Sequence, residues 1–222
     1  MNCSQVIARL RSHSNPKNVA GMARFGINPD KTFGVSIPVL RKLAKEIGKN
    51  HALAAELWKS GIHEAKVLAG MVDDPALVTE KQMDSWVKGF DSWDVCDQVC
   101  MNLFARTKFA SKKVFEWSKH KEEYVKRAAF ALIACIAWQD KQNKCKDYNK
   151  FLQIIKRESN DERNFVKKAV NWALRQIGKK DKEHNKMAIA TAKQILKLDS
   201  RAAKWIANDA IRELESKAAK LS

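Results

Sequence analysis

The chain has 222 residues, of which 45% are hydrophobic, and its 42 Lys and Arg outnumber its 25 Asp and Glu to give a net charge of +17. No run of 18 apolar residues occurs, which argues against a membrane-spanning helix, and the first 15 residues contain no apolar signal-peptide core, so we expect a cytoplasmic protein. A charge of this size favours polyanionic partners, most often nucleic acid.

The five cysteines form neither a CxxC pair nor a zinc-site spacing, so the sequence predicts free thiols and no metal site. Cys96 and Cys100 lie four residues apart, and we expect both to be small buried side chains.

The chain is predicted to be helical because glycine and proline are scarce and apolar residues recur at intervals of three and four. Pro38 suits a first helical turn, Asp91 or Ser92 suits a helix cap, and Gly178 suits a helix end. The predicted helices cover 3–13, 16–24, 37–49, 52–59, 62–73, 80–89, 93–107, 109–119, 122–138, 146–158, 163–178, 182–197 and 201–218.

Two of these helices are similar in sequence. "YVKRAAFALIACI" begins at Tyr124 and "FVKKAVNWALRQI" begins at Phe165, so the offset is 41 residues. This offset aligns Ala128 with Ala169, and another such step reaches Ala210 in a weaker match. A period near 40 with two helices per unit is typical of HEAT- or armadillo-like repeats. We therefore predict an all-α fold, a curved α-solenoid of HEAT-like repeats forming one domain over 1–222, with the second helices on the concave side. A helical bundle with coincidental similarity is the alternative.

Several catalytic motifs are absent. The sequence has no glycine-rich phosphate loop and no GxSxG elbow, and "HEAKV" at 63–67 lacks the second histidine of a zinc protease. His63 is expected either to hydrogen-bond at a helix end or to contact a phosphate.

The tryptophans fall into two groups. Trp93 stands at a helix start among polar residues, and Trp172 lies four residues after Lys168 and three before Arg175, so aromatic and basic groups share a helical face. Four other tryptophans have apolar neighbours at helical spacing and are predicted to be core residues: Trp58, Trp86, Trp117 and Trp138.

Cations recur at equivalent positions of the repeat. Lys126 and Arg127 begin one helix, and Lys168 stands at the position of Arg127 one unit later. Such a series suits successive phosphates, although a solvated charged face is the alternative.

Asp97 does not fit a plain phosphate-binding surface, because a carboxylate repels phosphates. It lies four residues after Trp93, so the two share a helical face. Three explanations are open: Asp97 is present by chance, it pairs with an arginine such as Arg127, or its ligand carries positive charge. N-alkylated purines are such ligands, and breaking their glycosidic bond builds positive charge on the sugar, which a carboxylate stabilises.

The ordered segments "FGVSIPVLRKLAKEIG", "HEAKVLAG", "SWDVCDQVC", "YVKRAAFAL" and "FVKKAVNWALRQIG" resemble the AlkD family of HEAT-like alkylpurine DNA glycosylases. The resemblance implies that Asp97 is the catalytic aspartate, that Trp93 and Trp172 contact the sugar, and that Arg127 binds phosphate. It also implies removal of 3-alkyladenine and 7-alkylguanine from double-stranded DNA without base flipping, metal or cofactor. Lys126, Lys168 and Arg175 are expected to contact the DNA backbone.

The resemblance weakens over the first 30 residues, and loop lengths between the motifs differ from the family pattern. Two other functions stay open: a non-catalytic HEAT scaffold for nucleic acid or an acidic protein, and an RNA-directed binder. We expect a monomer, since a solenoid that forms its own groove has no need to dimerise.

Overall fold

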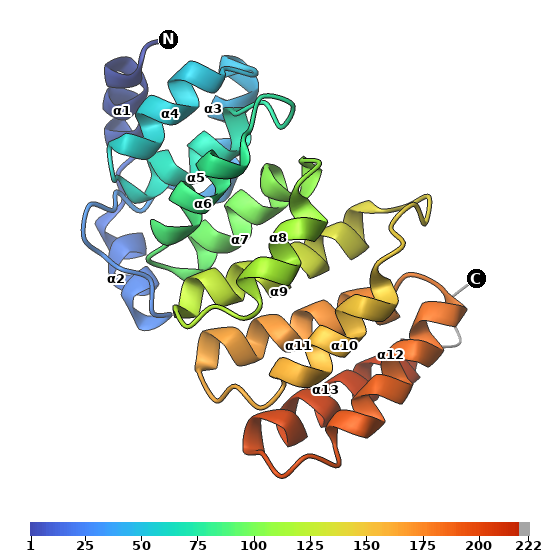
Figure 1. Cartoon of the computed structure of the whole chain (residues 1–222). Coiled ribbons are helices and arrows are strands. Elements are labelled where there is room, and N and C mark those ends of the chain that lie inside the picture. Colours follow the sequence, from blue (N-terminus) through green and yellow to red (C-terminus); the bar gives the residue numbers. More distant parts are fainter. Residues whose placement is uncertain (218–222) are drawn as a thin grey trace. The chain divides into compact units, whose positions relative to one another are not determined.

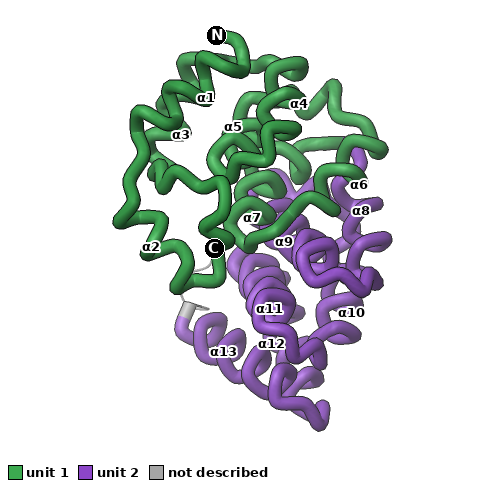
Figure 2. The backbone as a smooth tube through the Cα atoms, turned by 90° about the vertical axis from the view of Figure 1, so that its left-hand side faces the viewer, with its two compact units in different colours: residues 1–107 green, residues 108–222 purple. Residues whose placement is uncertain are grey.

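The structure, a computed structural model, describes residues 1–217, which form thirteen α-helices and one 3-10 turn with no strand in that range. The chain divides into two compact units, 1–107 and 108–222 (Figure 2). No described helix is both long and apolar enough to cross a membrane.

Unit 1 packs around α5, in which every residue except Met71 is buried. The contacts of α5 are with α1, α3, α4 and α7, and α1 also packs on α4. The helices of this unit are α1 (Cys3–Ser12), α2 (Pro16–Arg24), α3 (Ile37–Ile47), α4 (His51–Lys59), α5 (His63–Val72), α6 (Glu80–Lys88), α7 (Trp93–Asn102) and the 3-10 turn η1 (Phe104–Arg106) (Figure 1).

The close packing of α5 on α7 depends on a glycine. A Cβ at Gly70 would lie 3.1 Å from Val99 Cγ2 and 3.2 Å from Val99 Cα. The absence of a side chain therefore lets the backbones of the two helices approach.

Unit 2 consists of three helix pairs in two layers (Figure 1). The first layer contains α8 (Ala110–Trp117), α10 (Tyr148–Glu158) and α12 (Lys182–Ile195), and the second contains α9 (Glu123–Gln139), α11 (Asn164–Gly178) and α13 (Arg201–Lys217). Each first-layer helix packs on the second-layer helix that follows it, and α11 packs between α9 and α13.

The 41-residue repeat is visible in this packing. Ala128, Ala169 and Ala210 occupy equivalent positions of α9, α11 and α13, and all three are completely buried. The equivalent rings of Tyr124 and Phe165 stack with centroids 5.8 Å apart. The all-α, HEAT-like repeat architecture is thus confirmed.

The predicted helices are all present, and most of their ends lie within two residues of the predicted positions. One prediction differs by more, and another reaches beyond the described range. The predicted helix 93–107 stops at Asn102 and continues as η1, and position 218 lies outside the described residues. Pro38 lies in the first turn of α3 behind the N-cap Ser36, as predicted.

Gly178 ends α11 for a reason other than the predicted one. Its φ is not in the left-handed region, but a Cβ there would lie 2.6 Å from Leu214 Cδ1 and 2.9 Å from Ala188 Cβ. Gly178 therefore admits α12 and α13 against the end of α11.

The prediction of core tryptophans holds for Trp86 and Trp117, which are buried, while Trp58 is half-buried and stacks on Trp86 at 4.4 Å. It is wrong for Trp138, which is 51% exposed. Trp138 lies in the last turn of α9, where Lys141 Nζ sits 5.7 Å from its ring centroid. The helical spacing of apolar residues predicts which face of α9 is buried, but it does not predict where along the helix the burial ends.

Candidate nucleic-acid interface

Helix α7 places Trp93 and Asp97 one turn apart, and both side chains are half-buried. Four other residues of the helix are completely buried, namely Val95, Cys96, Val99 and Cys100. The prediction that the two cysteines are small buried side chains is thus confirmed. Because these apolar residues fix the helix in the core, Trp93 and Asp97 lie together on its partly accessible side.

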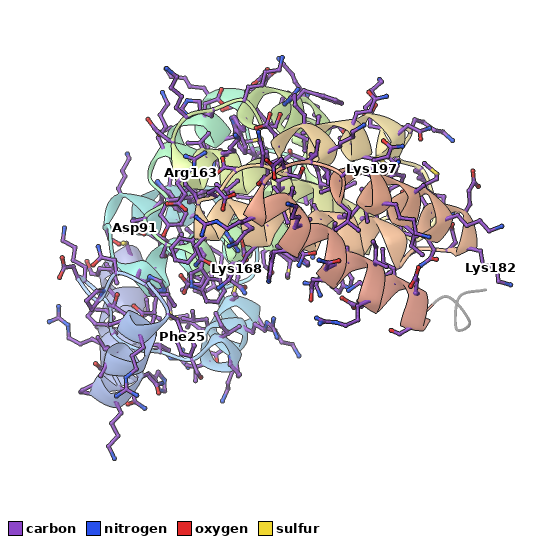
Figure 3. All side chains as sticks on the ribbon, turned by 90° about the horizontal axis from the view of Figure 1, so that it is seen from below. Phe25, Asp91, Arg163, Lys168, Lys182 and Lys197 are labelled. Carbon is purple, nitrogen blue, oxygen red and sulfur yellow. The ribbon has the colours of Figure 1, made fainter. Side chains whose placement is uncertain are left out.

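The Trp93 indole is anchored to the end of α2. Its Nε1–H donates to the backbone carbonyl of Phe25 over 3.0 Å, and Phe25 itself is 70% exposed (Figure 3). Since an indole has only this one donor, any ligand contact of Trp93 uses its π face or its carbon edge.

A pocket of about 440 Å³ opens beside Trp93 within unit 1. Helices α2, α3, α5 and α7 contribute to its lining, which is mainly apolar. Trp93, Asp94 and Gln98 line it from α7, but Asp97 does not. No sequence pattern pointed to this pocket, because its walls come from four separate segments.

His63 lies in the wall of this pocket and is buried, with Nε2 at 2.8 Å from Asp94 Oδ2. Burial alone would lower the pKa of His63, but the hydrogen bond and charge of Asp94 outweigh it and raise that pKa. Burial would likewise raise the pKa of Asp94, yet His63 holds it below its usual range. The hydrogen-bonded alternative for His63 is the one observed, and the contact favours the charged form of both side chains.

Trp172 is half-buried on α11 in unit 2. With the Gln176 amide oriented so that its oxygen faces the donors, that oxygen accepts from Trp172 Nε1 at 3.1 Å and from Lys179 Nζ at 3.3 Å. The single donor of this second indole is therefore also used within its own unit. On the same helix, Lys167 Nζ lies 5.3 Å from the ring centroid of Trp205.

The two cations at the start of α9 are held by neighbouring groups. Arg127 is 5% exposed and donates to the carbonyl of Phe165 over 2.6 Å. Lys126 forms ion pairs with Glu158 at 2.5 Å and Asp161 at 3.1 Å. Although burial acts in the opposite direction, hydrogen bonds from Arg163 and Lys126 lower the pKa of Asp161 to about 2.

On α11 the two predicted backbone contacts differ. Arg175 pairs with Glu213 and lies 3.6 Å from Asp209, both on α13. Lys168 is exposed, and its side chain makes no hydrogen bond or ion pair with the residues that the structure describes (Figure 3). Phosphate binding by Lys126, Arg127 or Arg175 thus stays a prediction. Each of these side chains would have to share its carboxylate or carbonyl partner with the phosphate, or give that partner up.

The positive charge belongs mainly to unit 2. Residues 108–222 contain 28 Lys and Arg against 14 Asp and Glu, whereas 1–107 contain 14 against 11. Trp93 and Asp97 therefore belong to a nearly balanced unit, and Trp172 and Arg127 to the strongly basic one.

Comparison with known proteins agrees with this architecture. A solved structure described as "A new family of proteins related to the HEAT-like repeat DNA glycosylases with affinity for branched DNA structures" is similar over 96% of this chain and 95% of that one, with a TM-score of 0.78 and 21% identity. No curated protein matches significantly. The family model described as "DNA alkylation repair enzyme" matches residues 6–214, so the chain belongs to that family.

Proposed function

We propose that the protein hydrolyses the N-glycosidic bond of cationic N3- or N7-alkylated purines in double-stranded DNA. The observation that carries the proposal is the state of the two tryptophans. Trp93 and Trp172 are half-buried, and each uses its N–H within its own unit. What remains of each indole is a flat apolar surface, which suits packing on deoxyribose and attraction of a cation.

In the proposed reaction the C1′–N bond breaks and its electron pair moves to the purine, which leaves as a neutral base. Positive charge develops on the sugar, and the Asp97 carboxylate stabilises it. Water then adds to C1′ and gives up its proton. Arg127 would hold a phosphate near the lesion, with Lys126, Lys168 and Arg175 as further backbone contacts.

The test is release of free base from N-methylated duplex DNA, measured by chromatography. Asp97→Asn keeps the side-chain shape but removes the charge, so we expect base release to fall by at least about 100-fold while DNA binding is kept. Asp199→Asn is the matched control, because it removes the same charge from an exposed side chain of unit 2. Wild-type release no greater than background would refute the proposal.

A second candidate is non-catalytic binding of nucleic acid, including branched DNA. It is favoured by the similar structure, which is described as having affinity for branched DNA. This function predicts tight binding of a four-way junction together with no base release. A salt-titrated competition between duplex DNA and structured RNA separates the RNA-directed alternative.

A further inference from the structure

The positive charge of unit 2 is not confined to the second-layer helices, which carry the cations predicted to contact DNA. Within their bounds the first-layer helices α8, α10 and α12 contain 8 Lys and Arg against 3 Asp and Glu. The second-layer helices α9, α11 and α13 contain 9 against 4, so the surplus is five in each layer. Lys113 is buried, but the other seven cations of the first layer are exposed. This layer is thus a second basic surface, which the proposed hydrolysis does not use.

Cations of the first layer extend into solvent. The side chains of Lys150 and Lys193 are 66% and 61% exposed. Lys182 begins α12 and Lys197 follows two positions after its last residue, and both are exposed (Figure 3). Exposed ammonium groups can reach a phosphate without leaving a buried partner.

Two shallow grooves run between the first-layer helices and mix cations with hydrogen-bonding side chains. The groove between α8 and α10, of about 450 Å³, is lined by Phe115, Lys119, Lys150, Gln153, Ile154 and Arg157. The groove between α10 and α12, of about 490 Å³, is lined by Asn149, Leu152, Gln153, Lys156, Met187, Thr191 and Gln194.

The polar groups of these grooves are of the kind that contacts DNA backbones. Lysine and arginine bind phosphate oxygens, while Asn, Gln and Thr side chains donate to phosphate or sugar. Lys156 Nζ lies 2.8 Å from Gln194 Oε1, so this cation has a neutral partner and keeps its charge uncompensated. Carboxylates are also present. Glu116 is held by Lys113 at 2.6 Å and Asp147 by Lys150 at 3.1 Å, and the exposed Glu215 of α13 lies 3.8 Å from Lys193.

We propose that the first layer of unit 2, defined by α8, α10 and α12, binds the backbone of a second DNA duplex. This contact does not depend on the DNA sequence, because the side chains of the first layer bind phosphate and sugar and not base edges. One chain would then hold two duplex segments.

The experiment titrates the full chain with a short undamaged duplex at low salt and measures stoichiometry by sedimentation. The variant Lys150→Gln/Lys156→Gln/Lys193→Gln removes three exposed charges from the first layer. The matched control Arg41→Gln/Lys42→Gln/Lys45→Gln removes three charges from exposed positions of α3 in unit 1. Undamaged DNA is used, so the result does not depend on base release.

We expect the wild type and the control to bind two duplexes, and the first-layer variant to bind one. The second binding event of the wild type should weaken steeply with salt, by a log–log slope of about 0.9 for each phosphate contacted. Lys150 and Lys193 should also be protected from acetylation by duplex DNA. One duplex per wild-type chain, equal loss in the control, or protection by phosphatidylserine vesicles but not by DNA would overturn the proposal.

Discussion

At the scale of single residues, the hydrogen bond from Trp93 to the Phe25 carbonyl separates two roles of the indole. Trp93→Phe keeps a flat ring and loses only the donor, and Phe25 is exposed enough for water to satisfy its carbonyl. Trp93→Leu loses the π face. We expect Trp93→Phe to retain most base release and Trp93→Leu to lose about 5- to 150-fold, which corresponds to roughly 1 to 3 kcal/mol of aromatic stacking.

This prediction is checked by single-turnover release at saturating enzyme, with folding monitored by circular dichroism. Equal losses in Trp93→Phe and Trp93→Leu would show that the N–H, and not the ring face, carries the effect.

The pair of His63 and Asp94 predicts a pH-dependent stability. A raised pKa for His63 gives stabilisation that is complete below the unfolded value of 6.5 and is lost as pH rises through the folded value. A lowered pKa for Asp94 gives stabilisation that is present above 3.8 and is lost as pH falls. The pair therefore stabilises most between pH 3.8 and 6.5.

His63→Gln should cost about 1 to 3 kcal/mol of unfolding free energy at pH 5.5, because a buried hydrogen bond to a charged group is lost. The cost should be smaller at pH 8.5. Urea titrations of both proteins at the two pH values measure the difference, and an equal cost at both would contradict an ionised pair.

At the scale of helices, two glycines inside helices should respond oppositely to the same substitution. A Cβ at Gly21 in α2 meets no atom within 4 Å, so Gly21→Ala should stabilise by about 0.5 to 1 kcal/mol through helix propensity. Gly70→Ala places its Cβ against the Val99 backbone and should destabilise by about 1 to 3 kcal/mol. Thermal unfolding measures both, and a stabilised Gly70→Ala would mean that α5 and α7 can separate freely.

The helices could be predicted because each carries its own apolar period and its own end signals, as Pro38 and Ser36 do for α3. The partners of charged residues could not. The carboxylates that hold Lys126 and Arg175 lie 32 to 38 positions later in the chain, where only the packing of neighbouring repeats brings them close. The sequence shows that cations recur at equivalent positions of the repeat, but it does not show which of them are paired with carboxylates.

At the scale of the whole molecule, the single-domain prediction for 1–222 stays open to a direct test. Only three residues join η1 to α8, so the chain offers no linker between units 1 and 2. We expect one calorimetric transition whose van't Hoff and calorimetric enthalpies agree. Two resolved transitions, or a calorimetric enthalpy well above the van't Hoff value, would instead show that the units unfold separately.

The regular spacing of partners in unit 2 has a consequence for folding speed. Bonds between successive repeats join residues at nearly constant separation: Arg127 to Phe165, Asn171 to Asp209 and Lys156 to Gln194 each span 38 positions. Each added repeat therefore closes a loop of the same length, so the loss of chain entropy on closure is the same for every repeat. Contact order stays low however many repeats are stacked, so unit 2 should fold by stepwise growth from whichever helix pair forms first.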